Sequence, residues 1–322
     1  MADVVCLGIL VVDVIARPVE AFPERGELML VEAISPHIGG CAANTGIGLQ
    51  KLGVETSVLG KVGRDGFGAL VCDVLHEHGV DARGVSRDND APTSATTVFV
   101  ARDGERSFLH SIGANAALGE DDIDWNLLRG ARLLHIAGHF LMPSFDGAAC
   151  SRVLERAKSL GLLTSLDTAG SPTAQWPELL RPCLKHLDYF VPSFQEALHC
   201  VPSHIEKTPP AVARYFCDEG VGVVALKMGE AGSFIRHKNN EWQLPSFLVN
   251  AIDATGAGDA FAAGFLAGII NGLDVEEAGK LGNAVGACCV TGVGTIAGIR
   301  SLEDTLAFMR EQNQSSTRLK LN

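Results

Sequence analysis

The segment Asp253–Phe265, which reads DATGAGDAFAAGF, places two carboxylates and one hydroxyl among glycines and alanines. From Ala260 onward the chain is apolar on all sides, which predicts a buried helix whose first turn lies near Asp259. The backbone N–H groups of a first turn have no partner within the helix and carry partial positive charge, so they suit an anion. The small residues of Gly256–Gly258 leave room for phosphate oxygens to approach. The segment therefore predicts a phosphate site with a carboxylate beside it.

Asp259 has two interpretations in this position. A carboxylate repels a bound phosphate, so it is useful only if it accepts the proton of a hydroxyl that attacks the phosphate. A base positioned in this way typically contributes about 10²–10⁴-fold to a rate. An aspartate also stabilises the start of a helix, which is a common structural use. On this segment alone the two interpretations are evenly balanced.

A second group of polar residues lies near the start of the chain. GILVVD (Gly8–Asp13) reads as the end of a first buried strand, which places Asp13 at the carboxyl end of that strand. HIGGCAAN (His37–Asn44) has two adjacent glycines before a predicted helix, with Asn44 on its first turn. Carboxylate and amide side chains bond hydroxyl groups, so Asp13 and Asn44 suit a polyol.

Strands and helices alternate along the chain. Short apolar strands are predicted at residues 56–63, 132–138, 162–168, 187–193 and 221–229, with helical stretches between them such as 40–53, 66–80 and 147–161. This alternation predicts an α/β fold with a doubly wound, mostly parallel sheet. Right-handed crossovers then place the loops at the carboxyl ends of the strands on one edge, where ligands bind.

One region departs from this alternation. Thr93–Gly113 reads as two strands around the turn Asp103–Gly104, and with residues 15–38 it predicts a small β-sheet lid over an active site. Arg106 in this hairpin either reaches the substrate from the lid or is a solvated turn charge, and the sequence favours neither. The exposed edge strand of such a lid is able to pair with its copy, which predicts a homodimer.

Composition narrows the class of protein. The 322 residues are 47% hydrophobic and 20% charged, which predicts a sizeable packed core. The net charge of −12 argues against nucleic-acid or membrane partners. The N-terminus has no basic segment and reads as a first strand. No stretch is long enough for a membrane helix. The nine cysteines include no C-x-x-C pair, which predicts reduced thiols in the cytoplasm.

Two segments together resemble the signatures of the ribokinase-like (PfkB) carbohydrate kinases. DATGAGDAFAAGF is similar to the C-terminal signature, and GGCAANTGIGLQKLG followed by GKVGRDGFG is similar to the N-terminal one. The signatures lie about 210 residues apart in the family's order, which is far more specific than a lone glycine-rich loop. The resemblance implies a three-layer α/β domain over residues 1–314, with a lid at about 15–38 and 93–113 and a polar tail at 315–322. It also implies transfer of the ATP γ-phosphoryl group, with Mg²⁺, to a hydroxyl of a sugar or nucleoside.

The resemblance also assigns roles on the phosphate and acceptor side. It implies that Asp259 is the catalytic base and that Gly256, Ala257 and Gly258 form the anion hole. It implies sugar-binding roles for the following residues: Asp13, Gly39, Gly40 and Asn44.

On the nucleotide side, the resemblance implies that Glu196 lies near metal and phosphate. Lys227 and Gly229 match the end of a nucleotide-side strand, and Asn283 matches an adenosine-side position. Asp253 and Thr255 match the positions that bind a monovalent cation in potassium-activated members. The chain departs from the family pattern at three positions: Ser193 replaces the family's Asn three residues before Glu196, Ala254 replaces a Thr or Pro, and Lys227 stands where Thr is common.

The acceptor is predicted to be a small neutral sugar. Family members that use sugar phosphates typically place a Lys just after the glycine pair, whereas this chain has Cys41–Ala43 and no cation before Asn44. A phosphorylated acceptor would bring nearly two negative charges to a site that already holds Asp13 and Asp259. The alternatives are a nucleoside kinase of the same fold and a non-catalytic nucleotide-binding regulatory protein.

Overall fold

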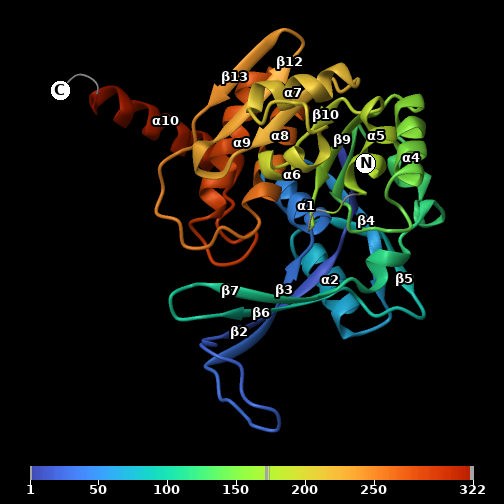
Figure 1. The fold of residues 1–322 in the computed structure, drawn as a ribbon, viewed down its shortest axis with the longest axis vertical. Coiled ribbons are helices and arrows are strands. Elements are labelled where there is room, and N and C mark those ends of the chain that lie inside the picture. Colours follow the sequence, from blue (N-terminus) through green and yellow to red (C-terminus); the bar gives the residue numbers. More distant parts are fainter. Residues whose placement is uncertain (1, 171–172, 174, 320–322) are drawn as a thin grey trace.

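A computed structural model describes residues 2–170, 173 and 175–319, which form two β-sheets (Figure 1). The larger sheet has nine strands. In spatial order they are β13 (Asn240–Leu244), β12 (Ser233–His237), β11 (Val223–Lys227), β10 (Tyr189–Phe190), β9 (Leu163–Thr168), β8 (Leu133–His139), β1 (Val4–Gly8), β4 (Thr56–Gly63) and β5 (Asp81–Asp88). The strands from β11 to β5 pair in parallel, so their carboxyl ends meet at one edge of the sheet.

Helices cover both faces of this sheet. Alternation along β1 shows the two faces directly, because Val4 and Cys6 belong to one apolar core and Val5 and Leu7 to the other. The first core is covered by α1 (Cys41–Lys51), α2 (Gly66–Glu77), α8 (Ala257–Ile270) and α9 (Val275–Cys289). The second is covered by α3 (Trp125–Leu128), α4 (Ala148–Ser159), α5 (Trp176–Leu184), α6 (Phe194–Cys200) and α7 (Pro209–Asp218). This arrangement confirms the predicted three-layer, doubly wound α/β fold.

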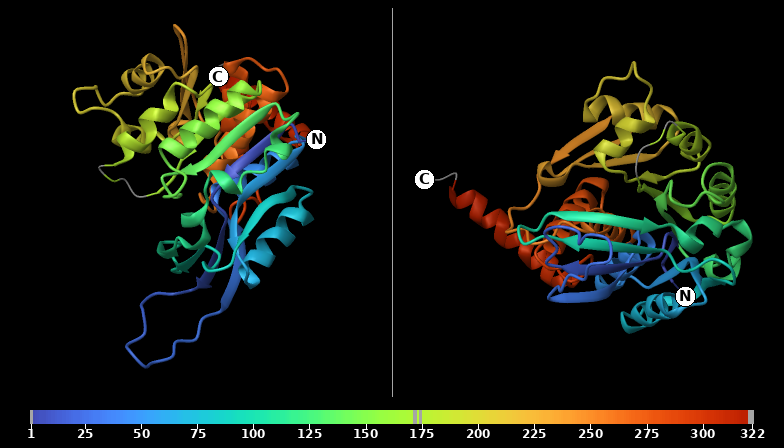
Figure 2. Two further views of the ribbon diagram at one scale, coloured as in Figure 1. Left: turned by 90° about the vertical axis from the view of Figure 1, so that its right-hand side faces the viewer. Right: turned by 60° about the horizontal axis from the view of Figure 1, so that its bottom comes forward.

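The smaller sheet is the predicted lid. Its strands, in spatial order, are β3 (Ala33–Gly39), β2 (Val11–Arg17), β6 (Ala95–Val100) and β7 (Arg106–Ser111). Figures 1 and 2 show this sheet projecting from one side of the main domain, with the loop between β2 and β3 at its far end.

The first predicted strand is in fact two strands in different sheets. β1 ends at Gly8 in the main sheet, and β2 begins at Val11 in the lid. The apolar run is continuous because both strands are buried here, so hydrophobicity alone gives no sign of the break. Asp13 therefore lies within a lid strand, and the prediction that it ends a main-sheet strand was wrong.

The two ends of the large sheet carry elements that the sequence analysis did not resolve. β12 and β13 form an antiparallel hairpin on an otherwise parallel sheet, and β5 forms the opposite edge. At the C-terminus, α10 (Leu302–Leu319) continues through residues 315–319 of the predicted polar tail, and residues 320–322 lie outside the described part. None of the helices that the structure describes has the length and apolarity needed to cross a lipid bilayer.

Candidate active site

Asp259 lies on the first turn of α8, where the sequence predicts it. Gly256 is the N-cap residue, with φ of 78°, and α8 begins at Ala257. The Asn44 side-chain amide, on α1, donates a hydrogen bond of 2.8 Å to Asp259 Oδ2, and the Thr45 hydroxyl donates to the Asp259 carbonyl at 3.4 Å. The packing of α1 against α8 thus fixes one carboxylate oxygen of Asp259.

The surroundings of Asp259 shift its proton affinity. Burial raises the pKa of Asp259 above its ordinary value, and the Glu196 carboxylate acts in the same direction. The hydrogen bond from Asn44 and the Lys227 ammonium oppose this rise in pKa, but the net direction is upward. A carboxylate with a raised pKa is a stronger base, as general-base catalysis near neutral pH requires.

Asn44 has a second feature that suits a bound hydroxyl. Its Nδ2 atom is used by Asp259, whereas its buried Oδ1 has no hydrogen-bond partner in the described part of the chain. A buried acceptor without a partner costs free energy, so this atom favours a ligand that donates to it.

Two parallel strands bring a buried lysine–aspartate ion pair to the same edge. Lys227, the last residue of β11, donates a 2.5 Å hydrogen bond to Asp167 Oδ2 on β9. Burial lowers the pKa of Lys227, but the carboxylates of Asp167, Glu196 and Asp259 outweigh it and raise that pKa, so the ammonium stays charged. A Cβ atom built on Gly258 would lie 3.3 Å from Lys227 Nζ, so this charge stands beside the predicted anion hole.

Glu196 is held by the residue that departs from the family pattern. The backbone N–H and hydroxyl of Ser193 donate to Glu196 Oε2 at 3.0 and 2.6 Å, and the Thr168 hydroxyl donates at 3.1 Å. Ser193 is also the N-cap of α6, so the two residues form a capping box. The S-x-x-E pattern in PSFQEA carries this signal, which the sequence analysis overlooked.

Arg106 reaches the main domain from the lid. Its guanidinium donates a 2.7 Å hydrogen bond to Asp253 Oδ1 and a second one to the Thr255 hydroxyl. Asp253 also accepts hydrogen bonds from the backbone N–H groups of Thr255 and Gly294. Arg106 is therefore not a solvated turn charge, and it contacts the two residues predicted to bind a monovalent cation.

The predicted sugar-binding residues converge from the lid and from α1. A Cβ atom on Gly39 would lie 2.3 Å from Asp13 Oδ2, and one on Gly40, whose φ is 91°, would lie 2.5 Å from the Ile9 carbonyl. Burial raises the pKa of Asp13, and the carboxylate of Asp259 adds to this rise. The structure thus places Asp13 within electrostatic reach of Asp259.

The two remaining predicted nucleotide-side residues lie outside this hydrogen-bond network. Gly229 has φ of 59° in the turn after β11. Asn283 on α9 is buried, and its amide donates at 3.1 Å to the carbonyls of Leu244 and Pro245. The geometry alone assigns neither residue to a nucleotide.

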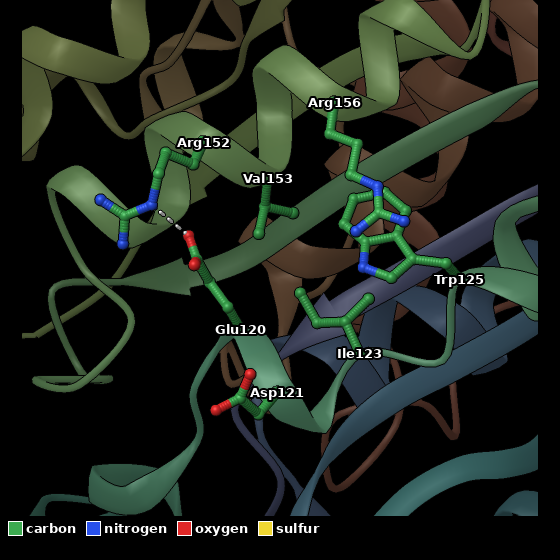
Figure 3. Close-up of a pocket in the computed structure, with 7 residues that line it drawn as sticks. All are labelled: Glu120, Asp121, Ile123, Trp125, Arg152, Val153 and Arg156. Carbon is green, nitrogen blue, oxygen red and sulfur yellow. Dashed lines mark hydrogen bonds and ion pairs between the residues drawn. The ribbon is translucent and has the colours of Figure 1, made fainter.

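A separate pocket of about 460 Å³ lies between α4 and the short segment before α3 (Figure 3). The Arg156 guanidinium stacks on Trp125 at 3.9 Å, and Arg152 donates to Glu120 at 2.7 Å. The pocket shares no lining residue with the Asp259 cluster, so it is not the predicted site.

Replacing Gly256 with Ala is expected to disturb the predicted anion hole more than the fold. A Cβ atom here would lie 2.6 Å from the Thr295 carbonyl at a positive φ, so the start of α8 must shift. We expect a loss of stability of about 1–3 kcal/mol and a larger loss of nucleotide affinity, measured by denaturation and calorimetry. Gly272→Ala, just beyond the other end of α8, is the control, because its φ of 80° is similar but its surroundings are open. Equal effects of both substitutions on nucleotide affinity would contradict the assignment.

With the geometry defined, comparison with solved structures places the fold among the ribokinases. The ribokinase of Arabidopsis thaliana, complexed with ribose and ATP, superposes with a TM-score of 0.83 at 25% identity, covering 96% of this chain and 98% of that one. A putative ribokinase II from E. coli, in complex with ATP and Mg²⁺, gives a TM-score of 0.83 at 27% identity, covering 97% and 100%.

Sequence comparison then identifies the family. A model of the pfkB family carbohydrate kinases matches residues 1–302, and the chain belongs to this family. It is 30% identical over 254 residues to an uncharacterized sugar kinase of Archaeoglobus fulgidus, covering 79% of this chain and 98% of that protein. It is 28% identical over 302 residues to the 2-dehydro-3-deoxygluconokinase of Bacillus subtilis, covering 90% and 91%. The protein is a carbohydrate kinase.

Proposed function

We propose that this kinase transfers the γ-phosphoryl group of ATP to a hydroxyl of a small neutral sugar, with Asp259 as the general base. The observation that carries the proposal is the position of the Asp259 carboxylate, which Asn44 holds on the first turn of α8. The carboxylate thus lies beside the backbone N–H groups that suit a phosphate.

The residues act together in the following way. Asp259 accepts the proton of the sugar hydroxyl as its oxygen attacks the γ-phosphorus, and the bond from that phosphorus to the β–γ bridging oxygen breaks. The N–H groups of Gly256 and Gly258 and the Lys227 ammonium offset the charge on the phosphoryl oxygens, whereas the Ala257 N–H donates to the Ala254 carbonyl at 3.3 Å. Their electrostatic effect requires no reorganisation at the moment of transfer, because Asp167 already holds Lys227 in place.

Mg²⁺ fits this donor set as a partner of the nucleotide. The described residues contain no group of three or more His, Cys, Asp or Glu side chains able to hold a metal by themselves. Mg²⁺ usually keeps several waters and binds through one or two carboxylates together with substrate phosphates. Glu196, fixed by Ser193 and Thr168, is the carboxylate that we propose for this role, through water. When bound, the ion neutralises charge on the β- and γ-phosphates.

The acceptor prediction is tested by a panel of compounds. We expect free pentoses, hexoses or nucleosides to show higher kcat/KM than fructose 6-phosphate or fructose 1-phosphate, because Asp13 and Asp259 repel an acceptor phosphate. ADP release is measured for each compound, with 2-dehydro-3-deoxygluconate included. A higher kcat/KM for any phosphorylated sugar than for every neutral compound would contradict the neutral-acceptor proposal. A nucleoside as the best acceptor would select the alternative within the family, and no acceptor-dependent ADP release with any compound would contradict the proposed acceptor class.

Potassium is expected to raise the activity. The Gly294 N–H donates a 3.0 Å hydrogen bond to Asp253 Oδ2, so the turn containing Gly294 lies against Asp253, and we propose that its carbonyls, with Asp253 and Thr255, supply oxygen ligands to the cation beside the proposed anion hole. Arg106 bonds the same carboxylate, so a cation at this position competes with the guanidinium. We expect stimulation by potassium in the wild type and stronger stimulation in Arg106→Met, compared with a bulky organic cation in steady-state assays. Identical rates in both salts for both proteins would contradict this proposal.

We also propose that the lid provides a homodimer contact. Ile34 on β3 and Leu109 on β7 lie on the face of the lid opposite Arg106, and each is 65% exposed. Burial of these side chains against a second copy would remove apolar surface from water.

A further inference from the structure

Four polar residues form one row across the lid sheet. The strand register places Asp13 directly opposite His37 on β3 and directly opposite Thr96 on β6, and Thr96 directly opposite His110 on β7. Residues paired in this way point to the same side of a sheet. We call His37, Asp13, Thr96 and His110 the lid row.

The lid row is on the side of the lid that turns toward the Asp259 cluster. Arg106 is four residues before His110 on β7, so the two side chains share a side of the sheet. Because Arg106 bonds Asp253 in the main domain, this side turns toward the start of α8. The row is therefore in place to contact an acceptor that lies between Asp13 and Asp259.

The hydrogen bonds within the row define which group donates and which accepts. His110 Nδ1 lies 3.1 Å from the Thr96 hydroxyl oxygen. Thr96 lies directly opposite Asp13, and its hydroxyl, acting as a hydrogen-bond donor, lowers the pKa of Asp13 against the larger rise caused by burial. A threonine hydroxyl has one hydrogen. If Thr96 donates that hydrogen to Asp13, its oxygen accepts from His110, which therefore carries its proton on Nδ1.

We propose that Thr96 and His110 are positioning residues for the acceptor, because His110 orients the Thr96 hydroxyl and Thr96 orients the Asp13 carboxylate. The carboxylate so fixed accepts hydrogen bonds only, so it selects a hydroxyl and disfavours a carboxylate or phosphate at that position of the acceptor. This inference rests on the proposed function and assigns a chemical reason to its preference for a neutral sugar. Gly39 supports it, because any side chain there would overlap Asp13 Oδ2.

Thr96→Val and His110→Phe test this relay, in which His110 orients Thr96 and Thr96 orients Asp13. Each removes one of its hydrogen bonds, so each is expected to raise KM for the best neutral sugar about 2- to 12-fold, as the loss of one ordinary hydrogen bond does. We expect kcat and KM for ATP to change less than about twofold, since uniform binding is lost rather than transition-state binding. Thr96→Ser keeps the hydroxyl and is expected to restore the wild-type KM.

The neighbouring threonine provides a matched control. Thr97 lies on the same strand, opposite Val14 and Leu109, and its side chain points to the other side of the lid. Thr97→Val has the same change in β-propensity and size as Thr96→Val but is expected to leave the sugar KM unaltered. Thermal unfolding of each variant checks that the lid remains folded.

The double variant Thr96→Val/His110→Phe separates a relay from two independent contacts. In a relay, the second substitution adds little, because both act on the same carboxylate. Three results would each overturn the inference. The first is a KM for the sugar in the double variant that rises by the product of the two single effects. The others are a Thr96→Ser variant with the same rise in KM as Thr96→Val, and an equal rise in KM for Thr97→Val. If the wild type phosphorylates sugars and the variants have the same KM for the sugar as the wild type, only this inference is refuted. If the wild type shows no sugar-dependent turnover, the proposed function is refuted as well.

Discussion

Replacement of Asp259 with Asn is expected to lower kcat by about 10²–10⁴-fold, as the loss of a general base does. Asn has nearly the same shape and still meets the Asn44 amide after a flip, so the start of α8 should keep its structure. Only the capacity to accept a proton is lost. Steady-state kinetics with the best acceptor give the ratio of kcat values.

The control for this substitution is nucleotide affinity, measured by calorimetry. It should be retained or increase slightly, because a negative charge beside the phosphates is removed. Turnover within a few-fold of the wild type would contradict the assignment of Asp259 as the base. A lost melting transition would show that the carboxylate has a structural role at the helix start.

Replacement of Lys227 with Met is expected to destabilise the fold by about 3–5 kcal/mol at pH 8, the range for removing one partner of a buried ion pair. Asp167 is then left buried without a cation, and burial already raises its pKa with Lys227 present. The pKa of this carboxyl is higher in the folded state than in the unfolded state, so the folded protein takes up the proton at a higher pH. The pKa of Asp167 is already about 7 in the wild type, so only the variant takes up this proton on folding above pH 7, and the deficit in the free energy of unfolding should shrink as the pH falls from 8 toward 7.

The double variant Asp167→Asn/Lys227→Met distinguishes stability from function. It removes both charges, so it should recover most of the stability and show no comparable pH dependence of the deficit, measured by denaturant unfolding. ATP affinity should fall in Lys227→Met and also in the double variant, because both lack the ammonium beside Gly258. Recovery of ATP affinity together with stability would show that Lys227 acts only through the fold.

The segment around Asp259 was predictable because its chemistry is local. A helix start, its glycines and its carboxylate lie within a few consecutive residues, and the first turn of α8 is where the sequence places it. The parallel sheet was also predictable, because buried strands such as β4 and β9 are short apolar runs between helices. The pairing of Asp259 with Asn44, 215 residues away, follows from the packing of α1 on α8 and has no local signal.

The lid was harder to predict from the sequence. Its existence followed from the hairpin at Thr93–Gly113, but a continuous apolar run concealed the change of sheet between Gly8 and Val11. As a result Asp13 was assigned to the wrong sheet, although it remains a candidate acceptor ligand. The lid row depends on the register of four strands from three parts of the chain, and register across distant strands is set by tertiary packing.

The most direct test of the central claim is ³¹P NMR of the wild-type protein with ATP, Mg²⁺ and the best neutral sugar from the panel. We predict a sugar phosphate resonance that grows in equal amount with ADP, and no such resonance on the same timescale with Asp259→Asn. Formation of ADP with inorganic phosphate alone, or a sugar phosphate formed equally fast by the Asp259→Asn variant, would contradict it.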